Sequence, residues 1–107
     1  MCNNERNDFE QLEKKVIKWA DDKGITKPDN SNKQLLKCMS ELGELADAEI
    51  ENDAAEIVDG IGDTIVTLII YANQKGLSIT SCLNSAYNEI KDRTGETVDG
   101  VFIKDEV

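Results

Sequence analysis

Histidine is absent from the 107 residues of this chain. Its absence excludes Ser-His and Cys-His nucleophilic catalysis, because both use an imidazole as the general base. It also excludes zinc sites built on histidine and the di-iron helical bundles that carry a Glu-x-x-His motif. Several common classes of active site are therefore ruled out before any motif is considered.

Cysteine and long apolar runs are also scarce. The three cysteines, Cys2, Cys38 and Cys82, are odd in number and form no C-x-x-C pair. We interpret them as reduced thiols and not as a disulfide framework. The polar N-terminus lacks the apolar segment of a secretory signal, and the longest apolar-rich run, residues 65–72, is too short to cross a bilayer. We therefore expect a soluble cytoplasmic protein.

Basic residues are also few relative to acidic residues. The chain has 12 Lys and Arg residues against 22 Asp and Glu residues, which gives a net charge of −10. Such a surface repels nucleic-acid phosphates and anionic lipid, so we expect no binding to nucleic acid and no binding to membranes. It suits divalent metal ions or a basic partner.

The remaining composition favours helix over sheet. The chain has one proline and 5% aromatic residues, and its apolar residues recur three and four positions apart. We predict a single all-α domain, residues 1–107, with helices at about 8–23, 32–51, 54–75 and 79–94 and a short extended C-terminal tail at 96–107. Asp53 and either Ser78 or Thr80 are predicted N-caps, and Gly24, Gly76 and Gly95 are predicted helix ends. The second half of the third helix is apolar almost all round, which indicates burial in a bundle centre or a subunit interface.

The carboxylates of the second and third helices form the most informative pattern. Glu41 and Glu44 leave the same face of one helix, one turn apart, and three acids on the next helix fall within an arc of about 60°. A solvated acidic surface is the simple interpretation. However, like charges at these spacings repel, and a glycine at position 43 is costly within a helix. Oxygen ligands alone fit Mg²⁺ or Mn²⁺, with phosphates of a substrate completing the shell. The predicted metal ligands are Glu41, Glu44, Glu56, Asp59 and Asp63.

Two acidic segments occur in a specific order, KCMSELGEL (residues 37–45) and EIVDGIGD (56–63). Together they resemble the MazG-like branch of the all-α nucleoside triphosphate pyrophosphohydrolases, whose pattern is K-L-x-E-E-x-G-E-L followed by E-x-x-D and an apolar helix. AYNEIKDRTG (86–95) and GVFIK (100–104) resemble the compact, often phage-associated members. The resemblance implies a four-helix bundle of the all-α NTP pyrophosphatase type, located in the bacterial cytoplasm or, for a phage protein, in that of the host.

The chain departs from the family pattern at two positions. Ser40 stands where the family often has the first of two glutamates. The family's E-x-x-D falls either on Gly60 and Asp63, where the glutamate is missing, or one turn earlier on residues 56 and 59. Glu41, Glu44 and Asp63 are therefore the first choices as metal ligands.

The resemblance implies hydrolysis of an NTP or dNTP between the α- and β-phosphates, releasing the monophosphate and pyrophosphate. We expect Glu41 to accept the proton of the attacking water. Lys91 and Arg93 are candidate phosphate contacts, although cations near a helix C-terminus also favour the helix dipole. Trp19 can stack on a base, but its place in an apolar stripe favours core packing. The full set of predicted substrate contacts is Lys91, Arg93, Lys37, Gln34, Asn88, Trp19 and Lys104.

The resemblance also implies a homodimer or homotetramer, with a role in removing non-standard nucleotides or in controlling a nucleotide pool. Two other functions stay open at this point. One is a non-enzymatic acidic helical protein that meets a basic partner. The other is a catalytically degenerate relative that binds nucleotide without turnover, which the residues at positions 40 and 60 make credible.

Overall fold

The computed structural model describes residues 8–106. Four helices and a two-stranded sheet follow one another along the chain, and a short 3-10 helix, η2 (Pro28–Asn30), precedes the second of them. The elements are α1 (Phe9–Asp22), α2 (Ser31–Glu51), α3 (Ala54–Gln74), α4 (Ile79–Ile90), β1 (Gly95–Val98) and β2 (Val101–Lys104). The predicted helical class and the four predicted helices are confirmed, although α4 ends four residues earlier than the sequence indicated.

The helix boundaries follow from local capping. The side chains of Asp53 and Ser78 accept hydrogen bonds from the backbone N–H groups of Glu56 and Ser81, as N-cap residues do. Gly24 and Gly76 adopt positive φ angles of 76° and 74° directly after α1 and α3. A left-handed residue at this place turns the chain away from the helix axis, so both glycines end the helices that they were predicted to end.

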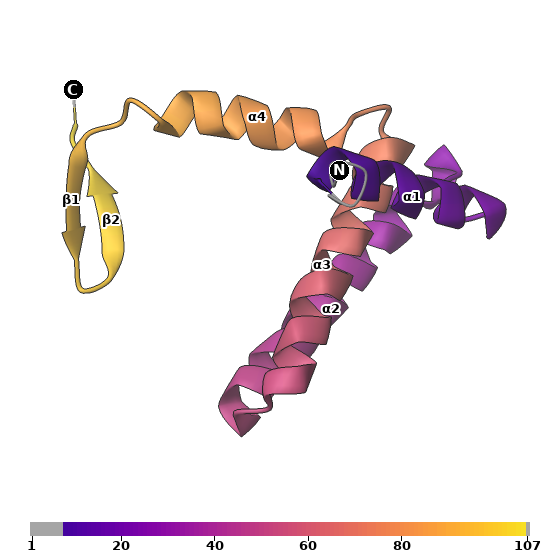
Figure 1. Ribbon diagram of the computed structural model, residues 1–107, viewed down its shortest axis with the longest axis horizontal. Coiled ribbons are helices and arrows are strands. Elements are labelled where there is room, and N and C mark those ends of the chain that lie inside the picture. The colour runs from indigo at the N-terminus through magenta and orange to yellow at the C-terminus, as the bar shows by residue number, and fades with distance from the viewer. Residues whose placement is uncertain (1–7, 107) are drawn as a thin grey trace, which may run out of the picture.

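Helices α2 and α3 lie side by side as an antiparallel pair, which we call the trunk (Figure 1). Gly60 is the point of close approach, because a Cβ atom there would lie 3.0 Å from Cβ of Leu45. The buried apolar residues lie between the trunk helices and where α1 crosses the trunk. Cys38 is among them, whereas Cys82 is exposed.

Helix α1 crosses the trunk near the end of α3 and is tied to the start of α4 (Figure 1). The Glu13 carboxylate, 4% exposed, accepts hydrogen bonds from Ser78 Oγ at 3.0 Å, the Ile79 N–H at 3.0 Å and Thr80 Oγ1 at 2.6 Å. Burial acts to raise its pKa, but the hydrogen bonds outweigh it and hold the pKa below the ordinary value of 4.5. Glu13 therefore fixes the direction in which α4 leaves the body.

Helix α4 and the hairpin β1–β2 extend away from the trunk, and we call them together the arm (Figure 1). Strand β1 pairs with β2 in antiparallel register, with Thr97 opposite Phe102, around a turn at Asp99 and Gly100. Among the described residues, the hairpin contacts no helix, and every residue from 81 to 106 is exposed. The tail predicted as a simple extended segment is thus a hairpin. No helix in residues 8–106 has the length and apolar character needed to span a membrane.

Candidate functional site

Residues from three helices line one hollow of about 250 Å³ beside the trunk. Trp19 comes from α1, Gln34, Lys37 and Glu41 from α2, and Asp63 from α3. All five were predicted as site residues from the sequence. Ile25, Val66, Thr67 and Ile70 also line the hollow and give it an apolar part.

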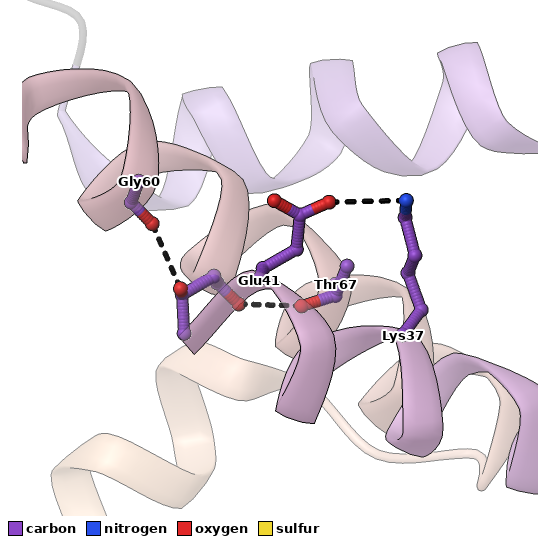
Figure 2. A network of polar contacts seen from close by, with 5 residues as sticks. Lys37, Glu41, Gly60 and Thr67 are labelled. Atoms are coloured by element: carbon purple, nitrogen blue, oxygen red, sulfur yellow. Dashed lines mark hydrogen bonds and ion pairs between the residues drawn. The ribbon is translucent and has the colours of Figure 1, made fainter. Parts of the chain in front are cut away.

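The charged part of the hollow is organised by one ion pair. Lys37 Nζ lies 3.1 Å from Glu41 Oε2, and Figure 2 shows the two side chains meeting one helical turn apart on α2. Glu41 is 9% exposed. The hydrogen bond to Glu41 and its charge raise the pKa of Lys37 above the usual 10.5, and the charges of Glu44 and Asp63 add to this effect. The Lys37 ammonium is thus paired with Glu41 and lies in the field of two further carboxylates.

A chain of hydrogen bonds on α3 lies beneath this ion pair (Figure 2). Thr67 Oγ1 donates to the Thr64 carbonyl at 2.8 Å, and Thr64 Oγ1 donates to the Gly60 carbonyl at 2.7 Å. Position 60 itself packs against Leu45, so any side chain there would press on the other trunk helix. The alignment on Gly60 and Asp63, in which the family glutamate is missing, supplies Asp63 alone to the hollow.

A second hollow, of about 370 Å³, adjoins the first and shares Trp19, Asp63 and Val66 with it. Its other walls are Leu12, Lys15 and Val16 from α1. Trp19 is 51% exposed, so the expectation that it packs in the core is wrong, and its indole is available at the boundary of the two hollows. Ligand sites in proteins occupy about 300–1,000 Å³, a size that the two adjoining hollows together reach.

The five predicted metal ligands are separated into groups. Glu41 and Asp63 share the first hollow, whereas Glu44 and Glu56 line another hollow of about 190 Å³, nearer the loop that joins α2 to α3. Asp59 is exposed and lines none of these hollows. Within residues 8–106, no three acidic or cysteine side chains lie close enough together to hold a metal ion. Mg²⁺ usually binds to one or two carboxylates, with waters and substrate phosphates as its other ligands, and Glu41 with Asp63 fits that smaller requirement.

The predicted contacts near the C-terminus lie elsewhere in the chain. Asn88 is on α4, Lys91 follows its end, and Arg93 and Lys104 line a hollow at the base of the hairpin. That hollow also contains Asp92, Asp105 and Glu106. A single chain therefore does not bring Asn88, Lys91, Arg93 or Lys104 to the hollow that holds Glu41.

Sequence reasoning missed several residues around these hollows. Lys15 faces the second hollow, and its position one turn before Trp19 on the same stripe was the available signal. Asp47 and Glu51 join Glu44 and Glu56, and the spacing of 44, 47 and 51 places all three on one helical face. The role of Glu13 had no signal in the sequence, because its partners lie 65 to 67 positions away.

Comparison with known proteins gives one informative match. The chain is 37% identical over 67 residues to an uncharacterised 18.2 kDa protein encoded in the rep-hol intergenic region of Haemophilus phage HP1. The match covers 63% of this chain and 41% of the phage protein, so the chain spans about two fifths of that relative's length. No protein-family description matches the sequence, and no solved structure matches it either.

Proposed function

We propose that the chain is a Mg²⁺-dependent nucleotide pyrophosphohydrolase, which cleaves an NTP or dNTP to the monophosphate and pyrophosphate. The observation that carries this proposal is the convergence of Trp19, Gln34, Lys37, Glu41 and Asp63 on one hollow. Each of these residue types suits nucleotide or metal chemistry, and the five come from three different helices. A solvated acidic surface gives no reason for an aromatic ring, an amide and a cation to join the carboxylates.

Glu41 and Asp63 are the residues that would hold Mg²⁺, or Mn²⁺ in its place, and Glu44 is close enough to influence the same cation site electrostatically. The bound ion would neutralise the triphosphate and lower the pKa of a coordinated water. The remaining predicted ligands, Glu56 and Asp59, lie outside this hollow and have a supporting role at most.

Lys37 links substrate binding to the release of Glu41. In the free protein its ammonium is paired with that carboxylate. A triphosphate entering the hollow offers Lys37 a more highly charged partner, and the lysine stem is long enough to turn toward it. Glu41 is then free to accept a proton. Gln34 can hydrogen-bond the base or ribose, and the exposed indole of Trp19 can stack on the base.

The chemical step is a hydrolysis at phosphorus. A water oxygen bonds to the α-phosphorus, and the bond between the α-phosphorus and the oxygen that bridges it to the β-phosphorus breaks. The proton of the water passes to the Glu41 carboxylate, and pyrophosphate leaves with the electron pair of the broken bond. Lys37 is positioned to stabilise the negative charge that develops on the phosphates.

Self-association belongs to the proposal. A four-helix bundle of the all-α NTP pyrophosphatase type needs more helices against the trunk than one chain supplies, because α4 points away in the arm. A homodimer or homotetramer provides them. A nucleotide-binding relative without turnover is the second candidate, and the observation that favours it is the Lys37–Glu41 ion pair, which neutralises the proposed proton acceptor.

The deciding experiment is a pyrophosphate-release assay on a panel of NTPs and dNTPs, including dUTP and oxidised bases, with Mg²⁺, Mn²⁺ or EDTA. We expect metal-dependent release of pyrophosphate and monophosphate. Glu41→Gln and Asp63→Asn should each lower kcat/KM by about 100-fold or more, while Lys37→Ala should raise KM. Glu49→Gln is the matched control, because it removes an exposed carboxylate of the same helix.

Each other result points to a different conclusion. Release of orthophosphate would contradict the proposed bond cleavage. Nucleotide binding to the wild type without any product would favour the degenerate relative. Neither binding nor turnover, together with thermal stability unchanged by Mg²⁺, would favour a non-enzymatic acidic protein with a basic partner.

A further inference from the structure

The surface of the chain is larger than that of a compact protein of its mass. Its accessible area is 8203 Å² and its radius of gyration is 16.6 Å. A compact protein of 11.9 kDa exposes about 6,000 Å², and 107 residues pack to a radius of gyration of about 13 Å. The excess of about 2,000 Å² per chain falls within the roughly 1,000–2,500 Å² that each subunit of an obligate homodimer buries.

The excess includes two apolar surfaces. The first is on the arm, where Leu83, Tyr87 and Ile90 form one stripe of α4 at spacings of four and three. In the hairpin, opposite residues share a face, so Val98, Val101 and Ile103 lie together. A two-stranded hairpin is marginal in water without a surface to pack on. We therefore expect the apolar side of the arm to pack against another protein surface.

The second apolar surface is on the trunk. Met39 on α2 is 64% exposed. It belongs to a row of apolar residues at spacings of four, three and four, which is typical of a helix that packs against other helices. On α3, the exposed apolar residues are spaced three and four apart. The trunk stripe consists of Leu35, Met39, Leu42 and Ala46 on α2 and Val58, Ile61 and Ile65 on α3.

Within one chain the two surfaces meet only near the start of α4, where Leu83 and Ile65 line one hollow of about 440 Å³. Among the described residues, α4 contacts α1 and α3 but not α2, and the hairpin contacts no helix. Figure 1 shows the arm leaving at the end of the trunk where α1 crosses, with the hairpin at its far end. Glu13 holds α4 in that direction.

We propose that a second copy of this chain covers both apolar surfaces and that the two copies exchange arms. Each arm packs its apolar side on the trunk stripe of the other copy. Every copy carries both surfaces, so a twofold arrangement covers two arms and two trunks at once and closes without leaving a free surface for a third copy. The inference does not rest on the proposed enzymatic activity. The net charge of −10 on each copy opposes association, so the dimer tightens as salt screens this repulsion.

The first test is the mass of the full chain in solution, measured by sedimentation over a range of concentration and salt. We expect twice the chain mass of 11.9 kDa. Ile90→Asp in α4 and Ile103→Asp in the hairpin should each weaken the dimer at least about 100-fold, as should Met39→Asp on the trunk. Ser85→Asp adds the same charge to the opposite side of α4 and should leave the dimer intact. Circular dichroism checks that each variant keeps its helix content.

The second test identifies which surfaces meet. Mixed ¹⁴N- and ¹⁵N-labelled protein is treated with a carbodiimide, which joins lysine to carboxylate groups that touch. Heavy-to-light links between Lys91 or Lys104 of one copy and α2 or α3 of the other are expected. The proposal is overturned if the chain is a monomer at all concentrations, or if Ile90→Asp and Ile103→Asp leave the dimer unchanged. It is also overturned if the intermolecular links join only arm to arm or only trunk to trunk. None of these outcomes depends on the nucleotide assay.

Discussion

Replacing Glu13 tests the contact that sets the direction of the arm. Its carboxylate accepts three hydrogen bonds at 2.6–3.0 Å, from two hydroxyls and the first backbone N–H of α4. Hydrogen bonds to a charged group contribute about 1.5–3 kcal/mol each, but Ser78 and Thr80 are only partly buried and can bond to water after the loss. We therefore expect Glu13→Ala to lower the free energy of unfolding by about 2–4 kcal/mol. For a domain of this size the melting temperature falls by about 10 °C or more.

The conservative variant Glu13→Gln separates charge from shape, because one amide oxygen still accepts and the volume is unchanged. It should cost about 1–2 kcal/mol at pH 7. The wild-type carboxylate has a pKa below its ordinary value of 4.5 in the folded state, so its charge stabilises the fold above that pH and stops doing so as the pH falls through the folded pKa.

Chemical denaturation of both proteins between pH 3 and pH 7 measures this effect directly. The difference in the free energy of unfolding between wild type and Glu13→Gln should shrink as the pH falls below about 4.5. Glu49→Gln, an exposed carboxylate on α2, is the control and should change stability by less than about 0.5 kcal/mol at any pH. A difference for Glu13→Gln that is constant from pH 7 to pH 3, or absent throughout, would refute the reasoning.

Two further predictions concern the trunk and the thiols. Gly60→Ala should destabilise the protein by about 1 kcal/mol, because overpacking against Cβ and Cα of Leu45 at 3.0 and 3.3 Å outweighs the gain in helix propensity. Gly62→Ala, which meets no atom within 4 Å, should instead stabilise it by up to about 1 kcal/mol in thermal unfolding. In a Cys2→Ser background, a thiol reagent should modify exposed Cys82 well before buried Cys38, and equal rates would contradict the packing of Cys38 against α3.

Local signals in the sequence account for most of the helices. The caps at Asp53 and Ser78 and the positive φ angles at Gly24 and Gly76 depend on residues within a few positions, so they can be predicted from the sequence. The hairpin also had a local signal, since Asp99-Gly100 between alternating side chains is typical of a tight turn with two positive φ angles. The prediction of an extended tail does not include this turn, which folds the segment back on itself.

Errors at the candidate site have a tertiary cause. Periodicity placed Trp19 on the apolar stripe of α1. Periodicity does not show which residues of such a stripe are covered by a neighbouring helix, and the Trp19 indole is half exposed where it borders two hollows. Helical spacing indicated that the five acids meet at one place, but only Glu41 and Asp63 share a hollow, and Glu44 lines another. It could not predict that Glu41 pairs with Lys37, since the same spacing allows that lysine to face solvent. The direction of α4 depends on Glu13, a contact across 65 residues that no local pattern encodes.

The trunk keeps its two proposed surfaces apart by helical geometry alone. Residues two positions apart on a helix point about 160° away from each other. Glu44 and Leu42 on α2 have this relation, as do Asp63 and Ile61 on α3. The carboxylates therefore face one side of the antiparallel pair and the exposed apolar side chains face the other. A substitution such as Met39→Asp that breaks the arm contact leaves the Lys37–Glu41 pair in place, so it tests subunit association without removing a side chain of the proposed nucleotide site.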